Sequence, residues 1–154
     1  MGLGNPILSD DAVGVRLATD FARRLEARRD LTVEPDCRAG GLDLLDVLAG
    51  HSRAIVIDSL RTVGGVPGRW FSFDAEALRE TMHLTNVHDA NFATALELGH
   101  RLGMPLPRAS EVHIFAVEVQ DSGTFSERMT PALEDGYPVY SAEIFREIER
   151  LLAA

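Results

Sequence analysis

The fold is decided close to the N-terminus, by the run Gly2-Leu3-Gly4-Asn5-Pro6-Ile7-Leu8-Ser9-Asp10-Asp11-Ala12-Val13-Gly14-Val15. Its glycines, asparagine and proline tolerate or impose unusual backbone angles, which predicts a tight turn. Ser9, Asp10 and Asp11 are residue types that cap a helix and complement the positive end of its dipole. From Val13, apolar residues recur at every fourth position, which predicts a helix running toward Ala27. The run is therefore interpreted as a turn that carries carboxylates into the start of a helix.

Composition indicates an ordinary globular protein. The 154 residues, 45% hydrophobic and 25% charged, predict a single domain over 1–154. A net charge of −9 argues against nucleic acid or an anionic membrane as the main partner. Cys37 is the single cysteine, which excludes an internal disulfide and a thiolate metal cluster. The absence of a long apolar run and of a signal peptide leads us to expect a cytoplasmic protein.

The rest of the chain alternates strand and helix signals. Apolar runs predict strands, and apolar residues at helical spacing predict helices. The predicted strands cover 31–34, 54–57, 69–73 and 112–119, and the predicted helices lie within 42–48, 92–102 and 144–152. This alternation predicts an α/β, three-layer sandwich with a twisted, mostly parallel sheet flanked by helices on both faces.

The start of the chain departs from this pattern. A glycine turn that leads into a helix normally follows a strand, and here Met1 alone precedes Gly2. We therefore expect the first strand to be truncated, by a late start or a true loss. Because that strand would lie inside the sheet, its loss should leave two unpaired strand edges.

Three side chains are candidates for one site. Ligands of open parallel sheets bind beyond the carboxyl ends of the strands. Asp11 follows the presumed first strand, Asp58 closes the run 54–57, and His88 lies in the loop before the helix of Phe92. Two carboxylates and an imidazole suit a borderline divalent cation such as nickel or zinc, with positions left open for substrate. The sequence therefore predicts a metal-recognition site, in which Asp89 could orient the imidazole.

Each candidate has a simpler interpretation. Asp10 or Asp11 could be a helix cap and nothing more, because aspartate is strongly preferred there. Asp58 could be a turn residue or could accept a ribose hydroxyl. A single histidine in a polar loop, such as His88, is more often solvated than catalytic. From pattern alone, a ligand site at the carboxyl edge of the sheet is as far as the prediction goes.

The opening run resembles the first motif of the [NiFe]-hydrogenase maturation proteases, the endopeptidases that trim the C-terminal extension of the hydrogenase large subunit. The likeness continues through 36–45, 55–58 and 67–68, through His88-Asp89, and into 126–131. It therefore spans nearly the whole chain. Ser9 stands where the family commonly has glycine, and 117–120 lacks the usual proline, which bears on the shape of one cleft wall and on the choice of partner.

By this resemblance, the family's two metal-contacting acids fall on Asp11 and Asp58 and its histidine on His88. The resemblance implies that these three residues are both metal-contacting and catalytic. It also implies a large-subunit precursor as partner, already loaded with nickel, so that nickel belongs to the substrate and is not tightly held by the free enzyme.

Two other functions remain open at this stage. A nickel-sensing maturation chaperone would keep the recognition site without proteolysis. A sequence similar to residues 2–6 also occurs at the start of the peptidyl-tRNA hydrolases. The net negative charge of the chain and the residues that follow Pro6 disfavour that alternative.

Overall fold

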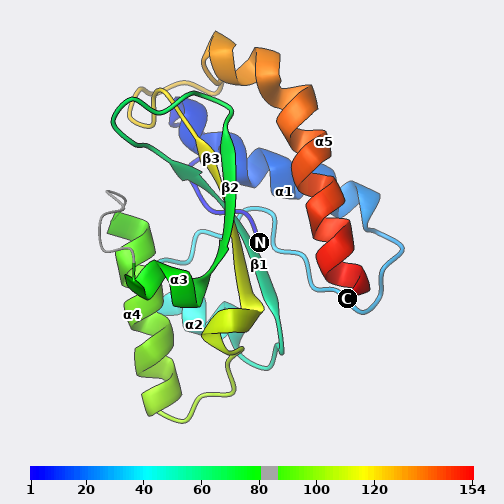
Figure 1. The fold of residues 1–154 in the computed structure, drawn as a ribbon, viewed down its shortest axis with the longest axis vertical. Helices are drawn as coiled ribbons and strands as arrows, with labels where there is room; N and C mark the ends of the chain where they lie inside the picture. The colour runs from blue at the N-terminus through cyan, green and yellow to red at the C-terminus, as the bar shows by residue number, and fades with distance from the viewer. Residues whose placement is uncertain (81–86) are drawn as a thin grey trace.

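The computed structural model describes the backbone of residues 1–80 and 87–154, and the side chains of 1–77 and 92–154 (Figure 1). Within these described residues, two 3₁₀ turns, η1 and η2, accompany the helices and strands. In chain order the elements are η1 (Ser9–Ala12), α1 (Val13–Arg24), α2 (Asp43–Leu48), β1 (Ala54–Leu60), β2 (Trp70–Asp74), α3 (Ala75–Glu80), α4 (Val87–Arg101), η2 (Ala109–Glu111), β3 (Val112–Glu118) and α5 (Pro131–Ala153).

The named strands form one small mixed sheet in the order β1-β3-β2. β1 and β3 are parallel, with Ala54 beside Val112 and Leu60 beside Glu118. β2 is antiparallel to β3 and forms an edge. The α/β prediction is confirmed, and the named strands form a mixed sheet with one parallel and one antiparallel pair.

Helices cover both faces of this sheet, as the apolar patterns predicted. Alternate residues of a strand point to opposite faces, so β1 and β3 supply two cores. One core packs Ile57, Phe115 and Val117 against α1 and α5. The other packs Val56 and Ile114 against α2 and α4. Figure 1 shows α1 and α5 on one side of the sheet and α2, α3 and α4 on the other.

The three residues Met1 to Leu3 run parallel to β1 and pair with it. Gly2 forms a parallel bridge to Ile57. Ile57 N–H donates to the Met1 carbonyl at 2.9 Å, and Leu3 N–H donates to the Ile57 carbonyl at 2.8 Å. On its other side, Gly2 N–H donates to the Glu34 carbonyl. Residues Met1 to Leu3 are therefore hydrogen-bonded on both sides, to β1 and to the segment that contains Glu34.

The strand predicted over 31–34 is wrong, because no strand is found there. The neighbouring backbone is that of Met1 to Leu3, and among the described residues two hydrogen bonds connect it to this part of the chain. Gly2 N–H donates to the Glu34 carbonyl, and Cys37 N–H donates to the Gly2 carbonyl. Pro35, which cannot donate a backbone hydrogen bond, separates these two contacts. The segment consequently runs beside the sheet without a ladder.

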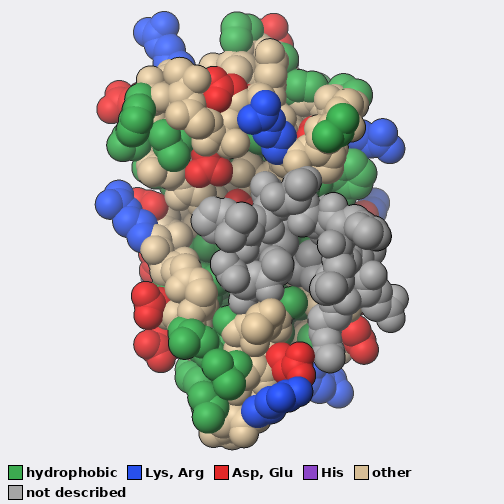
Figure 2. Space-filling view, turned by 90° about the vertical axis from the view of Figure 1, so that its left-hand side faces the viewer, with side chains coloured by type: hydrophobic (Ala, Val, Ile, Leu, Met, Phe, Trp, Pro, Cys, Tyr) green, Lys and Arg blue, Asp and Glu red, His purple; other side chains and the backbone are tan. Residues whose placement is uncertain are grey.

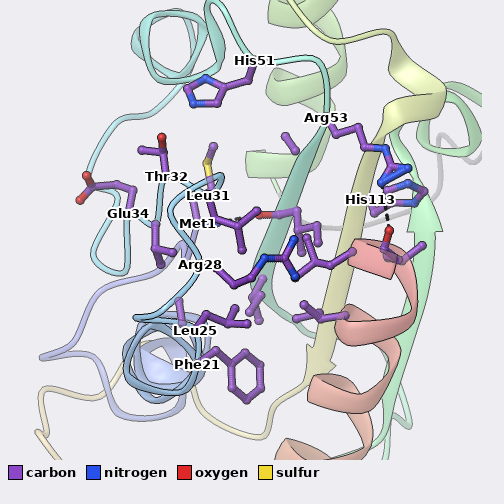
Figure 3. Close-up of a pocket in the computed structure, with 18 of the residues that line it drawn as sticks. Met1, Phe21, Leu25, Arg28, Leu31, Thr32, Glu34, His51, Arg53 and His113 are labelled. Carbon is purple, nitrogen blue, oxygen red and sulfur yellow. Dashed lines mark hydrogen bonds between the residues drawn. The ribbon is translucent and has the colours of Figure 1, made fainter. Parts of the chain in front are cut away.

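A groove of about 350 Å³ opens beside Met1, between β1 and residues 28–34 (Figure 3). Phe21 of α1 and Leu25, which follows that helix, lie on one side of it, and Val47 and Leu48 of α2 contribute to another. The groove is at the amino end of β1, opposite the carboxyl edge where the predicted site lies.

The surface mixes charged and apolar side chains. On the face shown in Figure 2, the visible arginines are separated from one another by acidic and apolar groups. Within the part of the chain that the structure describes, no helix is both long enough and apolar enough to cross a membrane.

Candidate functional site

The opening turn brings its carboxylates to the carboxyl edge of the sheet by close backbone packing. Gly4 has φ +124°, a conformation that favours glycine, and a Cβ there would collide with the Asp11 carbonyl. A Cβ at Gly14 would collide with the carbonyls of Leu3 and Ile57. These glycines therefore allow the turn and the start of α1 to lie directly against β1.

Asp11 is held at the edge of the sheet by two hydrogen bonds. Asn5 N–H donates to its Oδ2 at 2.8 Å, and the Ser59 hydroxyl donates to its Oδ1 at 2.7 Å. The first contact ties the carboxylate to its own turn and the second ties it to β1, 48 residues away in sequence. The structure thus brings the opening motif to the same part of β1 that carries Asp58.

Asp58 does not close its strand as predicted, because β1 continues to Leu60. Asp58 pairs with Ala116 of β3, is 7% exposed, and accepts a hydrogen bond from Ser59 N–H at 2.7 Å. The strand continues because the parallel pairing with β3 extends through Leu60 beside Glu118. Asp58 is thus a nearly buried carboxylate toward the carboxyl end of β1, beside the residue that contacts Asp11, which keeps it a functional candidate.

Asp11 and Asp58 approach the same point of β1 from different faces. Side chains alternate along a strand, so Asp58 projects to the face of Val56, which packs in the core of α2 and α4. Ser59 projects to the opposite face, toward α1, where its hydroxyl contacts Asp11. The two carboxylates are therefore linked through a single residue, Ser59.

His88 lies in the first turn of α4 and not in the loop before it, because α4 begins at Val87. Its side chain, with that of Asp89, lies outside the described residues, so the predicted imidazole contact stays a prediction. α4 nevertheless packs on the face to which Asp58 projects, through Phe92 and Leu96. Among the side chains that the structure describes, no three His, Cys, Asp or Glu residues are grouped to hold a metal ion.

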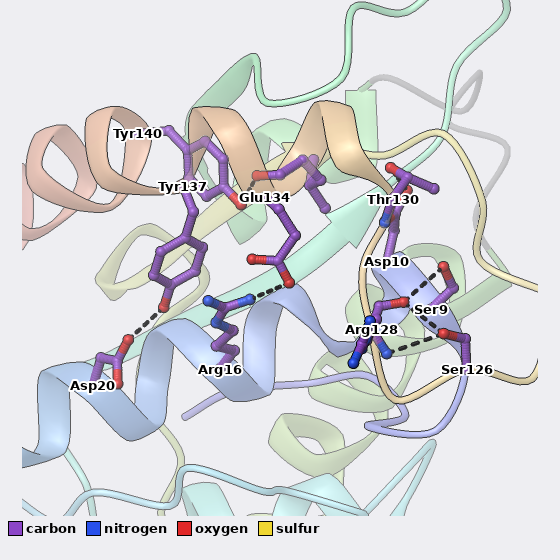
Figure 4. Close-up of polar contacts among 11 residues, drawn as sticks. Ser9, Asp10, Arg16, Asp20, Ser126, Arg128, Thr130, Glu134, Tyr137 and Tyr140 are labelled. Atoms are coloured by element: carbon purple, nitrogen blue, oxygen red, sulfur yellow. Dashed lines mark hydrogen bonds and ion pairs between the residues drawn. The ribbon is translucent and has the colours of Figure 1, made fainter.

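Asp10 and Asp11 are not helix caps, because neither η1 nor α1 has a side-chain capping bond. Asp10 is fully buried and accepts four hydrogen bonds from a distant loop. Its Oδ2 accepts from Gln120 N–H, Asp121 N–H and the Thr130 hydroxyl, each at 3.0 Å, and its Oδ1 accepts from Thr130 N–H at 2.6 Å. Asp10 thus holds the loop of residues 120–130, which leads into α5, against the opening turn (Figure 4).

The resemblance through 126–131 has a matching contact in the structure. Leu8 bridges to Ser126 in parallel, Ser9 N–H donates to the Ser126 carbonyl, and Ser126 N–H donates to the Ile7 carbonyl. Ser9 has φ +48°, the left-handed conformation in which glycine carries no side-chain penalty. This explains physically why glycine suits that position.

α5 is fixed over α1 by polar contacts that continue from this region (Figure 4). Arg16 pairs with Glu134 at 2.7 Å, and the Tyr137 hydroxyl donates to Asp20 at 2.6 Å. Burial, with the carboxylate of Asp20 beside it, raises the pKa of Tyr137 well above its ordinary value. Tyr137 is therefore a neutral donor at physiological pH and serves the packing of the two helices.

The sequence pattern did not reveal Glu118 or the role of Asp10. Glu118 ends β3 and is 1% exposed, and its carboxylate accepts from Thr62 N–H at 2.6 Å and from the Thr62 hydroxyl at 2.9 Å. It therefore fixes the loop after β1, on one side of the candidate site. The available signal was an acidic residue in an otherwise apolar strand, since such a residue needs buried donors.

Comparison with known proteins identifies the fold. No protein-family model and no curated protein matches the sequence. Among solved structures, the chain is similar to the hydrogenase maturating endopeptidase HybD from E. coli, with TM-score 0.69, 22% identity, and coverage of 97% of this chain and 90% of that one. It is also similar to the [NiFe] hydrogenase maturation protease HybD from Thermococcus kodakarensis, with TM-score 0.68, 19% identity, and coverage of 96% and 95%.

A third similar structure is the [NiFe] hydrogenase maturation protease HycI from Thermococcus kodakarensis KOD1, with TM-score 0.66, 16% identity, and coverage of 99% of this chain and 90% of that one. The similarity thus extends over almost the whole of both chains in each comparison. The protein therefore has the fold of the [NiFe]-hydrogenase maturation proteases.

Proposed function

We propose that the protein is an endopeptidase that removes the C-terminal extension of a nickel-loaded [NiFe]-hydrogenase large-subunit precursor. The fold shared with the maturation endopeptidases supports this activity. The observation that carries the proposal is the Ser59–Asp11 hydrogen bond, because it joins the opening motif to β1 one residue from Asp58. Two acids far apart in sequence are thereby linked at one edge of the sheet.

Asp11, Asp58 and His88 are the proposed contacts for nickel in the precursor. Carboxylate oxygens and an imidazole nitrogen are suitable ligands for this borderline ion. Because the nickel belongs to the substrate in this proposal, a precursor without it lacks the group that these three side chains recognise. Specificity for loaded precursor then follows as a difference of affinities.

The two carboxylates also supply the chemistry that peptide hydrolysis needs. Asp58 is nearly buried and Asp11 is half-buried. Two carboxylates in different environments can take different roles, one as general acid and the other as general base. A water beside one of them can lose its proton to the carboxylate as it attacks the scissile carbonyl. In this proposal the precursor's nickel positions the bond that is cut, and the protein's carboxylates handle the proton.

The experiment is co-expression of the precursor with wild-type protein or with Asp11→Asn, Asp58→Asn or His88→Ala, followed by intact-mass measurement of the precursor. We expect wild type to shorten the nickel-loaded precursor and each variant to reduce shortening at least about 100-fold, as loss of a catalytic group does. The matched control is His51→Ala, an exposed histidine at the end of α2 and away from the carboxyl edge.

Three results would contradict the proposal. If wild type binds the loaded precursor but leaves its mass unchanged, the protein acts as a nickel-sensing chaperone. If His88→Ala shortens the precursor at the wild-type rate, that histidine has no role in recognition or catalysis. Precursor from nickel-depleted cells should stay uncut by wild type, and cutting there would overturn recognition through nickel.

A further inference from the structure

Strand β2 forms an edge of the sheet, and part of its backbone points away from β3. At the start of the pairing, Arg69 lies opposite Glu118, whose N–H donates to the Arg69 carbonyl at 2.7 Å. Antiparallel partners alternate between pairs that exchange hydrogen bonds and pairs that do not. In the observed register, the backbone groups of Phe71 therefore face β3. Those of Ser72 point out of the sheet, as do those of the first and last residues of the strand.

This edge of the sheet is open among the described residues. The strand order ends at β2, and no backbone group of a described residue bonds to the outward groups of Ser72. Edge strands are commonly protected by lysine or proline, because an open edge pairs readily with another chain. Residues 70–74 contain neither, and the ring of Phe71 is 36% exposed. Strand β2 is therefore suited to binding an extended segment by strand addition.

The edge lies in line with the candidate site. Asp58 of β1 pairs with Ala116 of β3, which pairs with Phe71 of β2. Residues in such a row project to the same face of the sheet, so Phe71 lies on the face to which Asp58 projects. Neighbouring strands are about 4.8 Å apart, so a strand added beside β2 would lie about 14 Å from β1. About four or five extended residues span that distance.

The loop of residues 61–69 follows the same path along the carboxyl edge (Figure 1). It leaves β1, passes the end of β3, where Thr62 N–H donates to the Glu118 carboxylate, and enters β2. Two of its side chains are apolar and face solvent, since Val63 is fully exposed and Val66 is 60% exposed. Together with Phe71, they place exposed apolar side chains between the candidate site and the open edge, which favours a polypeptide as the bound partner.

We propose that the open edge of β2 binds the C-terminal extension of the precursor as an added β-strand, an inference that rests on the proposed function. The part of the precursor before the cut bond carries the nickel and is held by Asp11, Asp58 and His88, whereas the extension has no such anchor. Strand β2 is antiparallel to β3, so Trp70 lies toward the carboxyl edge and Asp74 away from it. An extension that leaves the site therefore runs parallel to β2 and reaches it about five residues after the cut.

The side chains of this edge specify the chemistry of the extension. Backbone pairing supplies affinity for any extended segment, and neighbouring side chains supply selectivity. The Arg69 guanidinium lies 5.3 Å from the centre of the Phe71 ring, and among the described residues it forms no ion pair with an acid. An extension with an apolar residue beside Phe71 and an acidic residue near Arg69 would fit this surface.

The test measures processing of the nickel-loaded precursor by wild type, Ser72→Pro and Ser72→Ala. Proline removes the outward N–H and is tolerated at sheet edges, whereas alanine keeps the N–H. We expect Ser72→Pro to raise KM about tenfold and to leave kcat within about twofold of wild type, because it removes a hydrogen bond used in binding alone. Ser72→Ala should match wild type, and equal melting temperatures of the two variants show that the sheet is intact.

A shortened precursor locates the effect. An extension cut to about its first four residues cannot reach β2. Its KM with wild type should be about tenfold higher than that of the full precursor, and Ser72→Pro should change it by less than about twofold. A synthetic peptide of the whole extension, in excess, should slow hydrogen exchange of the wild-type Ser72 amide at least about twofold, and a peptide of the first four residues should not. This measurement needs no variant, so it decides the proposal even if Ser72→Pro does not fold.

Equal KM values for Ser72→Pro and Ser72→Ala with the full precursor would overturn the proposal. So would an equal effect of Ser72→Pro on the full and shortened precursors, or unchanged exchange of the Ser72 amide with the whole-extension peptide. In each of these cases wild type still shortens the precursor, so the proposed function stands. If wild type leaves the loaded precursor uncut, the proposed function fails, and the binding of an extension at β2 fails with it.

Discussion

At the scale of single residues, Asp10 and Asp11 show how neighbours in sequence acquire different roles. Asp10 is fully buried, and its four donors include three backbone N–H groups. Asp11 is half-buried and accepts from one backbone N–H and one hydroxyl. A hydroxyl can rotate to accept a hydrogen bond, whereas a backbone N–H can only donate. The two positions should therefore respond differently to the same substitution.

We predict that Asp10→Asn lowers the free energy of unfolding by about 2–4 kcal/mol, because an amide NH₂ must then face a backbone N–H in either orientation. Asp11→Asn should cost less than about 1 kcal/mol, since Asn can accept from Asn5 while the Ser59 hydroxyl turns to accept from its amide. Urea denaturation with an unchanged m-value measures both. Equal losses at the two positions would contradict this assignment of roles.

At the scale of elements, the segment Met1 to Leu3 pairs with β1, and the amino group of Met1 donates to the Ile55 carbonyl at 2.6 Å. Burial lowers the pKa of the Met1 amino group from 8.0 to about 6, against the opposing effects of Cys37 and Glu34. Between these two values the unfolded chain binds more protons than the folded chain. Stability should therefore rise with pH across that window.

We predict that the free energy of unfolding of the chain that retains Met1 rises by about 2 kcal/mol between pH 6 and pH 8. The control is the same chain with an acetylated amino group, which cannot titrate. The measured quantity is the difference between the two stability curves, which removes every contribution that the two chains share. Parallel curves from pH 6 to 8 would show that the amino group is as well solvated in the folded state as in the unfolded one.

At the scale of the whole molecule, the net charge of −9 bears on the choice of partner. The basic side chains visible in Figure 2 lie singly among acidic and apolar groups. Nucleic-acid affinity depends mainly on contacts between cationic groups and phosphates. A protein substrate is compatible with this surface, whereas a tRNA substrate would meet net repulsion.

We therefore predict no binding of tRNA up to about 100 μM protein at 150 mM salt, weaker than the usual non-specific range of about 10⁻⁴–10⁻⁶ M. Fluorescence anisotropy of labelled tRNA measures this, with a basic RNA-binding protein as the positive control. Salt-sensitive binding in the micromolar range would revive the alternative of a peptidyl-tRNA hydrolase.

The fold was predictable wherever short-range patterns carried the information. The helix from Val13, the short helix around Leu45 and the strand beginning at Val112 each appear where apolar spacing predicts them. The strand at 31–34 failed because a strand depends on partners that local spacing does not include. The candidate site was predictable as residue types in a given order, yet the contact of Ser59 with Asp11 left no pattern in the sequence.

By itself, the sequence determined the helices that begin at Val13 and near Leu45 and the buried strands that begin at Ala54 and Val112, because their patterns depend on residues a few positions apart. It also determined that acids stand near the carboxyl edge of the sheet. Tertiary structure alone decided that Asp10 fastens the loop before α5, that Ser59 links Asp11 to β1, and that a groove lies beside Met1. Each of these depends on a hydrogen bond or packing contact between segments far apart along the chain, which forms only when the layers assemble.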